Sequence, residues 1–471
     1  MKTLTIFTLV LTITLAACGG SSQQMAGIDA RGNLPPVGVV SKGTIAGFGS
    51  IIVNGVRYDT SNATINADGS PGVQGDLKVG QVVTVHGTLD NDPGTGVAAT
   101  VTFDDLVEGP VSAIDTAAGT ITVLSQLVII DADTSFDDNI SPASIDGLQI
   151  NDIVEVSGFF LADGSISATR IEAKPAGSEF EVTGVVSNLM ATTFQINNLV
   201  VDFSAAQLDD FPGGTPEDGQ LVEAKGNSIG GAGQLEATRV EFKGNDLGAD
   251  DGDQVEVEGF ITRFVSATDF DVEGIPITTS GATVFENGTS ADLAINRKVE
   301  VEGRIDANGI ITATKIEIKL SNFIRIEGMV ESLGASSVTI FGIQINVDSL
   351  TRYEDKSSAD LETFGLANIN VGNYLETRGY EDASGVVATR VEREDFDGEV
   401  AIRAFVDSVS EPNFTIHGVM IETNGNTVFR DLNDAPITAT EFFAQAMGSL
   451  AEAVGTPSNG GIIADEVELE D

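Results

Sequence analysis

One unit recurs six times along this chain of 471 residues, and the recurrence limits the fold more strongly than any other feature. Each unit opens with a strand that carries a glycine, or in the last unit an alanine, and these positions lie roughly 70 residues apart. They are Gly43, Gly109, Gly184, Gly259, Gly328 and Ala404. A spacing of this size predicts an array of small domains rather than a tightly wound solenoid.

Three further markers follow that glycine in a fixed order. A hairpin glycine comes first, as in IIVNGVRYD from Ile51 and DVEGIPIT from Asp271. In the third unit Asn197-Asn198 replaces it and can still form the turn, because Asn tolerates positive φ. A strand ending in glycine comes next, VEVEG from Val299 in the clearest unit. The last marker is a strand of the ATRIE type, which begins at Ala168, Ala237, Ala313 and Ala388.

The clearest unit, residues 254–319, alternates apolar and polar residues as half-buried β-strands do. Turn signals at Glu273-Gly274 and Asn308-Gly309 separate the strands, and Asn-Gly is typical of a type I′ hairpin. The segment 278–296 is longer and is expected to hold a loop or a short helix. Five short strands with this break after the third predict a small closed barrel of OB-like type, and closure leaves no unpaired edge.

The predicted fold class is therefore all-β: a tandem array of OB-like five-stranded barrels, with a short helix in the last unit. That helix is expected within residues 438–455, where Phe442, Met447, Leu450 and Val454 can share one helical face. The expected segments are a lipoprotein signal peptide at 1–17, a lipidated cysteine and flexible tether at 18–41, and repeats at 42–105, 106–174, 179–243, 254–319, 323–394 and 397–471, with an acidic linker at 244–253.

The first 20 residues, MKTLTIFTLVLTITLAACGG, have the pattern of an export signal. A short basic start precedes an apolar run that is too short to span a membrane. Leu15-Ala16-Ala17-Cys18 resembles the lipobox of bacterial lipoproteins, which implies cleavage before Cys18 and acylation of its sulfur and amine. The alternative is an ordinary signal peptide with an incidental cysteine. Gly19 follows the cysteine, where Asp would be the usual inner-membrane retention signal of such lipoproteins, so an outer-membrane anchor facing the periplasm or the surface is expected. Two or three acyl chains anchor a protein durably.

Net charge excludes some partners. With 71 acidic and 24 basic residues the chain carries −47, and such a surface repels nucleic acid and anionic lipid. Binding to single strands also needs stacking aromatics, and the chain has no Trp and four Tyr. We therefore expect no nucleic-acid partner; a protein partner in the envelope or outside the cell stays unidentified.

A basic residue recurs in the ATRIE-type strands, at Arg170, Arg239, Lys315 and Arg390. The recurrence allows a multivalent anion site. Each of these residues is followed two positions later by a glutamate on the same strand face, so cross-strand pairing with carboxylates is the simpler role.

Acidic loops are the candidate metal ligands. Asp246, Asp250, Asp251 and Asp253 lie in GNDLGADDGDQ between the third and fourth units, and Asp-rich loops with glycine can supply the oxygen ligands of calcium. No cofactor other than calcium is expected. Similar loops contain Asp90, Asp92, Asp131, Asp133, Asp137 and Asp138. None matches an EF-hand loop, so solvated acidic linkers are the competing interpretation.

Catalysis has little support in the sequence, and no catalytic residue is predicted. The two histidines, His86 and His417, lie in different units and neither has a metal-ligand partner at suitable spacing. A glycosidase needs only two carboxylates and remains a distant alternative, although few aromatic residues are present to hold a sugar.

The stretch GTIAGFGSIIVNGVRYDT (43–60) and the ATRIE-type strands resemble a family of repeat lipoproteins of Gram-negative bacteria, built on an OB-like domain of unknown function. The resemblance covers most of the mature chain. It implies a secreted, membrane-anchored β-repeat protein and brings no known activity. The expected function is that of a non-catalytic envelope lipoprotein serving as scaffold, spacer or adhesion module, with a calcium-responsive binding protein as the alternative.

Overall fold

A computed structural model describes residues 37–90, 94–131, 133–244, 246–382, 384–432 and 435–470. The signal peptide, Cys18 and residues 19–36 of the expected tether lie outside these residues. The first strand begins at Val37, so residues 37–41 belong to a strand and not to the tether. Within the described residues no helix is long and apolar enough to cross a membrane.

Repeat 4 shows how one unit closes. Its first strand pairs with its second and its fourth, its third runs parallel to its fifth, and the fifth pairs with the fourth, so that the ladder returns to its start. A short extra strand also runs parallel to the fifth. The strands are β20 (Gln254–Ser266), β21 (Asp269–Val272), β22 (Ile275–Thr278), the extra β23 (Val284–Glu286), β24 (Lys298–Ile305) and β25 (Ile311–Ile318). The segment expected to be a loop or helix holds β23 and a 3-10 turn at Ser290–Asp292.

The first three repeats have the same order of pairing. Repeat 1 comprises β1 (Val37–Gly47), β2 (Ile51–Val53), β3 (Val56–Asp59), β4 (Thr64–Ala67), β5 (Ser70–Gly72), β6 (Val82–Leu89) and β7 (Thr95–Phe103). Repeat 2 comprises β8 (Val107–Asp115), β9 (Thr120–Val123), β10 (Gln126–Ile129), β11 (Ser135–Phe136), β12 (Ile153–Phe160) and β13 (Ile166–Lys174). Repeat 3 comprises β14 (Phe180–Ser187), β15 (Thr193–Ile196), β16 (Leu199–Asp202), β17 (Gln207–Asp209), β18 (Leu221–Ile229) and β19 (Leu235–Phe242).

The last two repeats keep this order with small changes. Repeat 5 comprises β26 (Ile324–Met329), β27 (Ser332–Leu333), β28 (Ser337–Ile340), β29 (Ile343–Asn346), β30 (Arg352–Asp355), β31 (Tyr374–Asp382) and β32 (Gly385–Glu394), its first strand being split into β26 and β27. Repeat 6 comprises β33 (Val400–Ser410), β34 (Asn413–Ile416), β35 (Val419–Glu422), β36 (Val428–Arg430), β37 (Pro436–Ile437), the helix α1 (Ala439–Ala446), β38 (Leu450–Ser458) and β39 (Gly461–Glu470). Short 3-10 turns precede the fourth barrel strand in repeats 1, 2 and 5, at Gln74–Asp76, Ile145–Gly147 and Leu366–Asn368.

The expected helix of repeat 6 is confirmed, but it is shorter than its composition suggests. Thr438 caps α1 by accepting from the backbone of Glu441, and Phe442 is fully buried against the barrel. Leu450 and Val454 lie on β38, which pairs with both β33 and β39 and so fills the place of the VEVEG strand. Pairing on both sides outweighs the helix preference of Ala and Glu in this segment.

The glycine of each VEVEG-type motif lies within its strand, and its small size has a steric cause. At Gly87, Gly158, Gly226, Gly303, Gly379 and Gly455 an added Cβ would fall within 3.0 Å of a carbonyl oxygen of the last strand. The register of the two strands shifts at each of these glycines, which marks a β-bulge. Bulges bend a strand, so this marker is the point at which each barrel curls shut.

The turn predictions are partly right. Glu273 and Gly274 both have positive φ, 51° and 75°, as a type I′ hairpin requires, and Asn197 (φ 49°) makes its turn as expected. At Asn308-Gly309 only Gly309 has positive φ, so the predicted type I′ turn is wrong there. Asp306 instead accepts from the backbone N–H of Asn308 and closes a longer loop.

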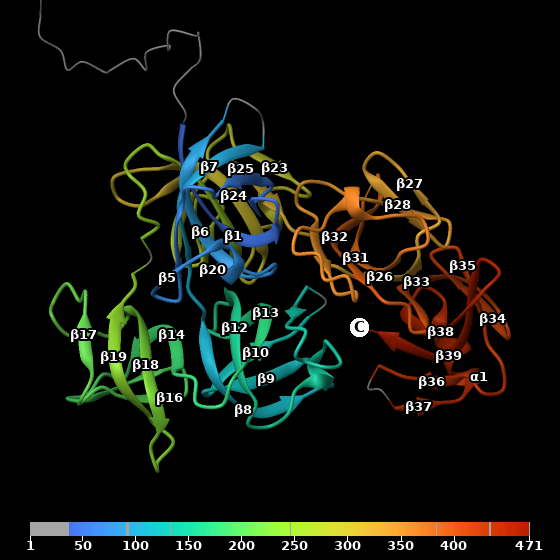
Figure 1. Ribbon diagram of the computed structural model, residues 1–471, viewed down its shortest axis with the longest axis horizontal. Helices are drawn as coiled ribbons and strands as arrows, with labels where there is room; N and C mark the ends of the chain where they lie inside the picture. Colours follow the sequence, from blue (N-terminus) through green and yellow to red (C-terminus); the bar gives the residue numbers. More distant parts are fainter. Residues whose placement is uncertain are drawn as a thin grey trace, which may run out of the picture. The chain divides into compact units, whose positions relative to one another are not determined.

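The repeats pair in an order that differs from the chain. Repeat 2 joins repeat 3 through antiparallel β8 and β14, and repeat 5 joins repeat 6 through antiparallel β26 and β33. Repeat 1, however, joins repeat 4: β1 lies parallel to β20, with Val39 opposite Gln254 and Lys42 opposite Val257 (Figure 1). The sheets therefore form three pairs, 1 with 4, 2 with 3, and 5 with 6, and not a simple string in chain order.

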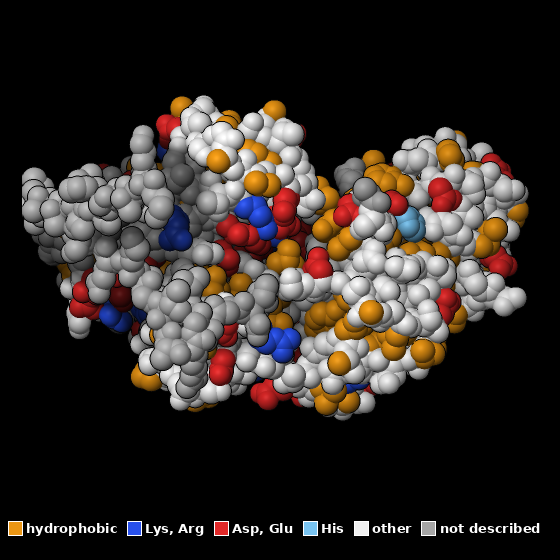
Figure 2. All heavy atoms as spheres, turned by 90° about the horizontal axis from the view of Figure 1, so that it is seen from above, with side chains coloured by type: hydrophobic (Ala, Val, Ile, Leu, Met, Phe, Trp, Pro, Cys, Tyr) orange, Lys and Arg blue, Asp and Glu red, His pale blue; other side chains and the backbone are white. Residues whose placement is uncertain are grey.

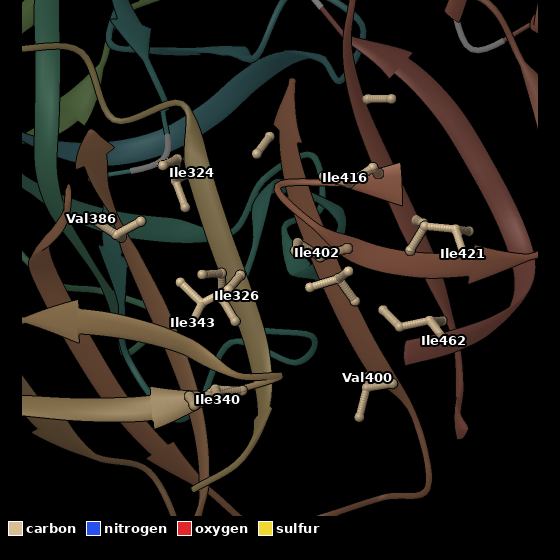
Figure 3. Packing of buried hydrophobic residues seen from close by; sticks show 14 of the residues in the cluster. Ile324, Ile326, Ile340, Ile343, Val386, Val400, Ile402, Ile416, Ile421 and Ile462 are labelled. Atoms are coloured by element: carbon tan, nitrogen blue, oxygen red, sulfur yellow. The ribbon is translucent and has the colours of Figure 1, made fainter. Parts of the chain in front are cut away.

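The apolar cores follow these pairs. One continuous cluster fills repeats 5 and 6, where Ile324 and Ile326 of β26 face one barrel and Ile402 of β33 and Ile416 of β34 face the other (Figure 3). Repeats 2 and 3 likewise share one cluster. Repeats 1 and 4 keep separate clusters, although Val40 of β1 packs into the core of repeat 4.

Glu256 lies buried in the strand pairing between repeats 1 and 4, where its carboxylate accepts a 3.0 Å hydrogen bond from the Ser41 hydroxyl. Burial raises the pKa of Glu256 to about 7 against that hydrogen bond, and the charge of Glu300 adds to the increase. Because the folded chain then holds the proton more tightly than the unfolded chain, stability falls as pH rises from 4.5 to about 7 and is level above it.

Glu256→Gln is expected to remove this loss and raise the free energy of unfolding at pH 8 by on the order of 2 kcal/mol, with little change at pH 4.5. Urea unfolding at the two pH values measures it. Glu286→Gln, at an exposed carboxylate of the same repeat, is the matched control and should change neither value by more than about 0.5 kcal/mol. An unchanged pH slope in Glu256→Gln would contradict the interpretation.

Candidate functional site

A cavity of about 540 Å³ lies where residues of repeats 1, 2, 4, 5 and 6 meet. Its wall includes Lys298, Lys319 and Arg352, a local gathering of cations in a strongly acidic chain. Lys298 pairs with Glu258 at 2.9 Å and Lys319 with Glu300 at 2.9 Å. On the face seen in Figure 2, most of the few basic side chains lie close to acidic ones. The cations of this cavity thus already join elements of the fold.

Arg170 of β13 links three repeats. Its side chain is 6% exposed, and its guanidinium pairs with Glu172 at 2.6 Å within repeat 2. It also reaches Glu354 of repeat 5 at 3.2 Å and donates to the carbonyl oxygen of Val79 in repeat 1 at 3.0 Å. The planar guanidinium suits such branched contacts, because its donors point in several fixed directions.

Arginines of repeat 5 also contact repeat 2. Arg390 of β32 donates to the carbonyl oxygen of Thr134 at 2.8 Å, and Arg352 of β30 donates to that of Asp133 at 2.6 Å. Arg390 also forms a buried ion pair with Glu392. Arginines of both repeats thus take part in the junction: those of repeat 5 donate to the backbone of repeat 2, and Arg170 of repeat 2 pairs with a carboxylate of repeat 5.

The basic residues of the ATRIE-type strands pair with carboxylates as predicted, although Arg170, Arg239 and Arg390 each contact the glutamate two positions later on their own strand. Lys315 forms the predicted cross-strand pair, with Glu302 at 2.7 Å. The side chain of Arg239 is 42% exposed and pairs with Asp209 and Glu241 of its own repeat. The structure therefore distributes these cations over separate places and does not gather them into one anion site.

The predicted calcium residues have local roles in the described structure. Asp246 accepts from the backbone N–H of Gly248 at 2.9 Å, and Asp253 accepts from that of Asp250 at 2.9 Å. Among the described residues, the carboxylate groups close enough to share one ion do not include these four. Calcium at the 244–253 linker stays a prediction.

The other acidic loops and the histidines are dispersed too. Asp131 and Asp137 accept from the backbone of Asp133 and Asn139, as Asx turns do. Asp90 follows β6, and Asp92 lies outside the described residues. His86 lies on β6, whereas His417 occupies a hairpin turn of repeat 6 with φ 47°.

Five carboxylates that the sequence did not single out come together from repeats 1, 2 and 3. Their oxygens form two groups that share Asp105, and within each group the atoms lie within 4.8 Å of one another. The groups are Asp68, Asp105 and Glu181, and Asp105, Glu108 and Glu155. Burial and the charge of Glu155 raise the pKa of Asp105 well above its usual value. Burial likewise raises the pKa of Glu155, to about 7, although Lys174 opposes it.

No local motif marks this cluster, because its members are far apart in the chain. Glu108, Glu155 and Glu181 belong to strand positions that alternate with core residues, and Asp105 lies in the short connection between repeats 1 and 2. The one available signal is Asp104-Asp105 itself, an acidic pair set between the apolar residues Phe103 and Leu106.

Six closed barrels joined by buried charged contacts define a β-repeat protein. Six segments of the chain match the family described as Domain of unknown function (DUF5666), and together they span most of the described residues. The matched segments are 37–102, 108–172, 183–241, 258–317, 327–392 and 403–468. The chain belongs to the DUF5666 family.

No curated protein matches the chain. A solved structure titled "drosophila Unr CSD456" is similar at 16% identity, covering 46% of this chain and 98% of its own, with a TM-score of 0.12. A score this low carries no argument about fold or function.

Arg170→Ala is expected to lower the free energy of unfolding by about 3–5 kcal/mol, because it leaves the buried carboxylate of Glu354 without this partner. Arg239→Ala, at the equivalent but exposed position of repeat 3, should cost about 1 kcal/mol or less. Urea unfolding of the two variants measures the difference. Equal losses would contradict the assignment of Arg170 to a buried junction.

Proposed function

We propose that this protein is a non-catalytic, lipid-anchored lipoprotein of the cell envelope whose six barrels form a scaffold that presents a binding or adhesion surface. The observation that supports the scaffold is that buried charged side chains join one repeat to another. Arg170 contacts repeats 1 and 5 from repeat 2, and Glu258 of repeat 4 accepts from the backbone of Thr44 in repeat 1 at 3.0 Å. Contacts of this kind give a scaffold a fixed arrangement of its units.

An OB-like identity for each barrel is part of the proposal. The strands follow the order first, second, third, fifth and fourth around the barrel, and the third is parallel to the fifth, as β22 is to β25. This order supports a five-stranded OB-like barrel. The acidic surface, net charge −47, favours a protein partner in the envelope or outside the cell over nucleic acid.

The lipid anchor follows from the lipobox at Cys18, the only cysteine of the chain. Acylation there would place the scaffold on the outer membrane, with residues 19–36 as the tether. Two or three acyl chains hold a protein at a membrane durably, as a lasting platform requires.

Cys18→Ser is expected to abolish labelling by radioactive palmitate in a Gram-negative host and to move the protein from the membrane fraction to the soluble one. Ser21→Ala, three residues further along, is the matched control and should keep both the label and the membrane location. Incorporation of label and membrane fractionation measure the effect. A wild-type chain that takes up no label would overturn the anchor.

A further inference from the structure

Asp105 lies in the connection between β7 and β8 and is 1% exposed. Neither of its carboxylate oxygens receives a hydrogen bond from a donor among the described residues. Burying an ionised carboxylate without a partner is costly, so a native structure normally supplies a cation, a donor or a proton.

The surroundings of Asp105 add negative charge. Glu108 of β8 lies directly opposite Glu155 of β12 on one side and Glu181 of β14 on the other. Three like charges in one row across neighbouring strands destabilise a sheet. Oε1 of Glu181 is also buried without a donor. Asp68 completes the group from repeat 1.

The lysines nearby neutralise only part of this charge. Lys225 contacts Asp68 at 2.7 Å and also pairs with Glu181, while Lys174 contacts Glu108 at 3.8 Å and also pairs with Glu155. Among the described residues these two are the cations paired with the five carboxylates, and neither is paired with Asp105. If all five carboxylates were ionised, the two lysines would leave an excess of three negative charges.

The equivalent junction between repeats 5 and 6 contains an arginine that the junction between repeats 2 and 3 lacks. There Glu327 of β26 lies opposite Glu376 of β31, and Arg325 contacts both, the latter at 2.7 Å. Arg325 precedes Glu327 by two positions, and the residue that precedes Glu108 by two positions is Leu106. Repeats 2 and 3 thus keep these two glutamates and lack the guanidinium, and they add Asp105 and Glu181, whose counterpart on β33 is Ala401.

We propose that this cluster binds a hard divalent cation, with calcium as the best fit, and that Asp105 is its central ligand. Calcium takes six to eight oxygen ligands in flexible geometry, which suits carboxylates drawn from three repeats. A cavity of about 190 Å³ borders Asp105 and has room for water ligands. Asp246 of the acidic linker also lines this cavity.

The bound ion would join repeat 1 to the pair formed by repeats 2 and 3. Asp68 lies in the turn between β4 and β5, and Glu181 lies on β14, so one ion would hold elements of repeats 1 and 3 against the connection that carries Asp105. This role differs from the predicted calcium loop, whose residues lie at the junction of repeats 3 and 4.

The full-length chain, purified in detergent and freed of metal by EDTA, tests the proposal. Its thermal midpoint and its calorimetric binding of CaCl₂, and separately of MgCl₂, are measured at fixed ionic strength. The expected result is saturable calcium binding with an upward shift of several degrees at a hundred times Kd. Asp105→Asn, which keeps the size and removes the charge, should weaken binding at least tenfold and abolish the shift.

Two further variants distinguish the alternatives. Asp251→Asn, at an exposed carboxylate of the acidic linker, is the matched control and should keep the shift. Asp68→Asn, at the partly exposed edge of the cluster, should weaken calcium binding while the chain still folds. The proposal is overturned if the wild type shows no binding, if Asp105→Asn binds as well as the wild type, or if Asp251→Asn loses the shift. A wild type indifferent to metal together with a more stable Asp105→Asn would assign the cluster to a bound proton.

Discussion

The parallel pairing of β1 with β20 is the constraint on which the rest of the structure depends. It joins residues 215 positions apart, as in the hydrogen bond between Ser41 and Glu256. Repeats 2 and 3 lie between repeats 1 and 4 in the chain, so the segment that contains them must begin and end at this paired unit. The pairing of β8 with β14 makes repeats 2 and 3 one unit, and this unit contacts repeats 1, 4 and 5.

Buried charge gives these contacts their specificity at an energetic cost. Desolvation of an ion pair often offsets the attraction between its members, so such pairs contribute less to stability than to the choice of partner. Arg170 and Arg390 donate to backbone carbonyls of another repeat, which only one relative placement of the two repeats satisfies. Asp105 is the exception, because its charge is not balanced by the described residues.

Much of each barrel could be predicted from the sequence. Alternation of residue type identifies the strands, and the recurring glycine of the VEVEG marker coincides with a bulge, because no larger residue fits there. The predicted helix is wrong at Leu450 and Val454. Ala and Glu favour a helix locally, but the pairing with β33 and β39 makes this segment a strand. Local preference yields to tertiary context in this way.

The order of the repeats and the acidic cluster could not be predicted. Every unit offers a similar first strand, so periodicity does not tell which two of them pair. The carboxylates that surround Asp105 come from β8, β12, β14 and a turn of repeat 1, and no spacing in the chain links them. By contrast, the sequence predicts that the basic residues of the ATRIE-type strands pair with carboxylates, and Lys315 forms the predicted cross-strand pair with Glu302.

The most direct test of the pairing of repeats 1 and 4 uses introduced cysteines in the chain from Gly19 onward, which contains no other cysteine. A Cβ at Gly38 would lie 3.5 Å from Oδ1 of Asp253, so Gly38→Cys with Asp253→Cys should form a disulfide on mild oxidation. Gly38→Cys with Ser178→Cys, at the corresponding position of repeat 3, should not. Rapid cross-linking of the first pair alone, seen as a shift in gel mobility, is the expected result. No cross-link in the first pair, or equal cross-linking in both, would contradict the arrangement.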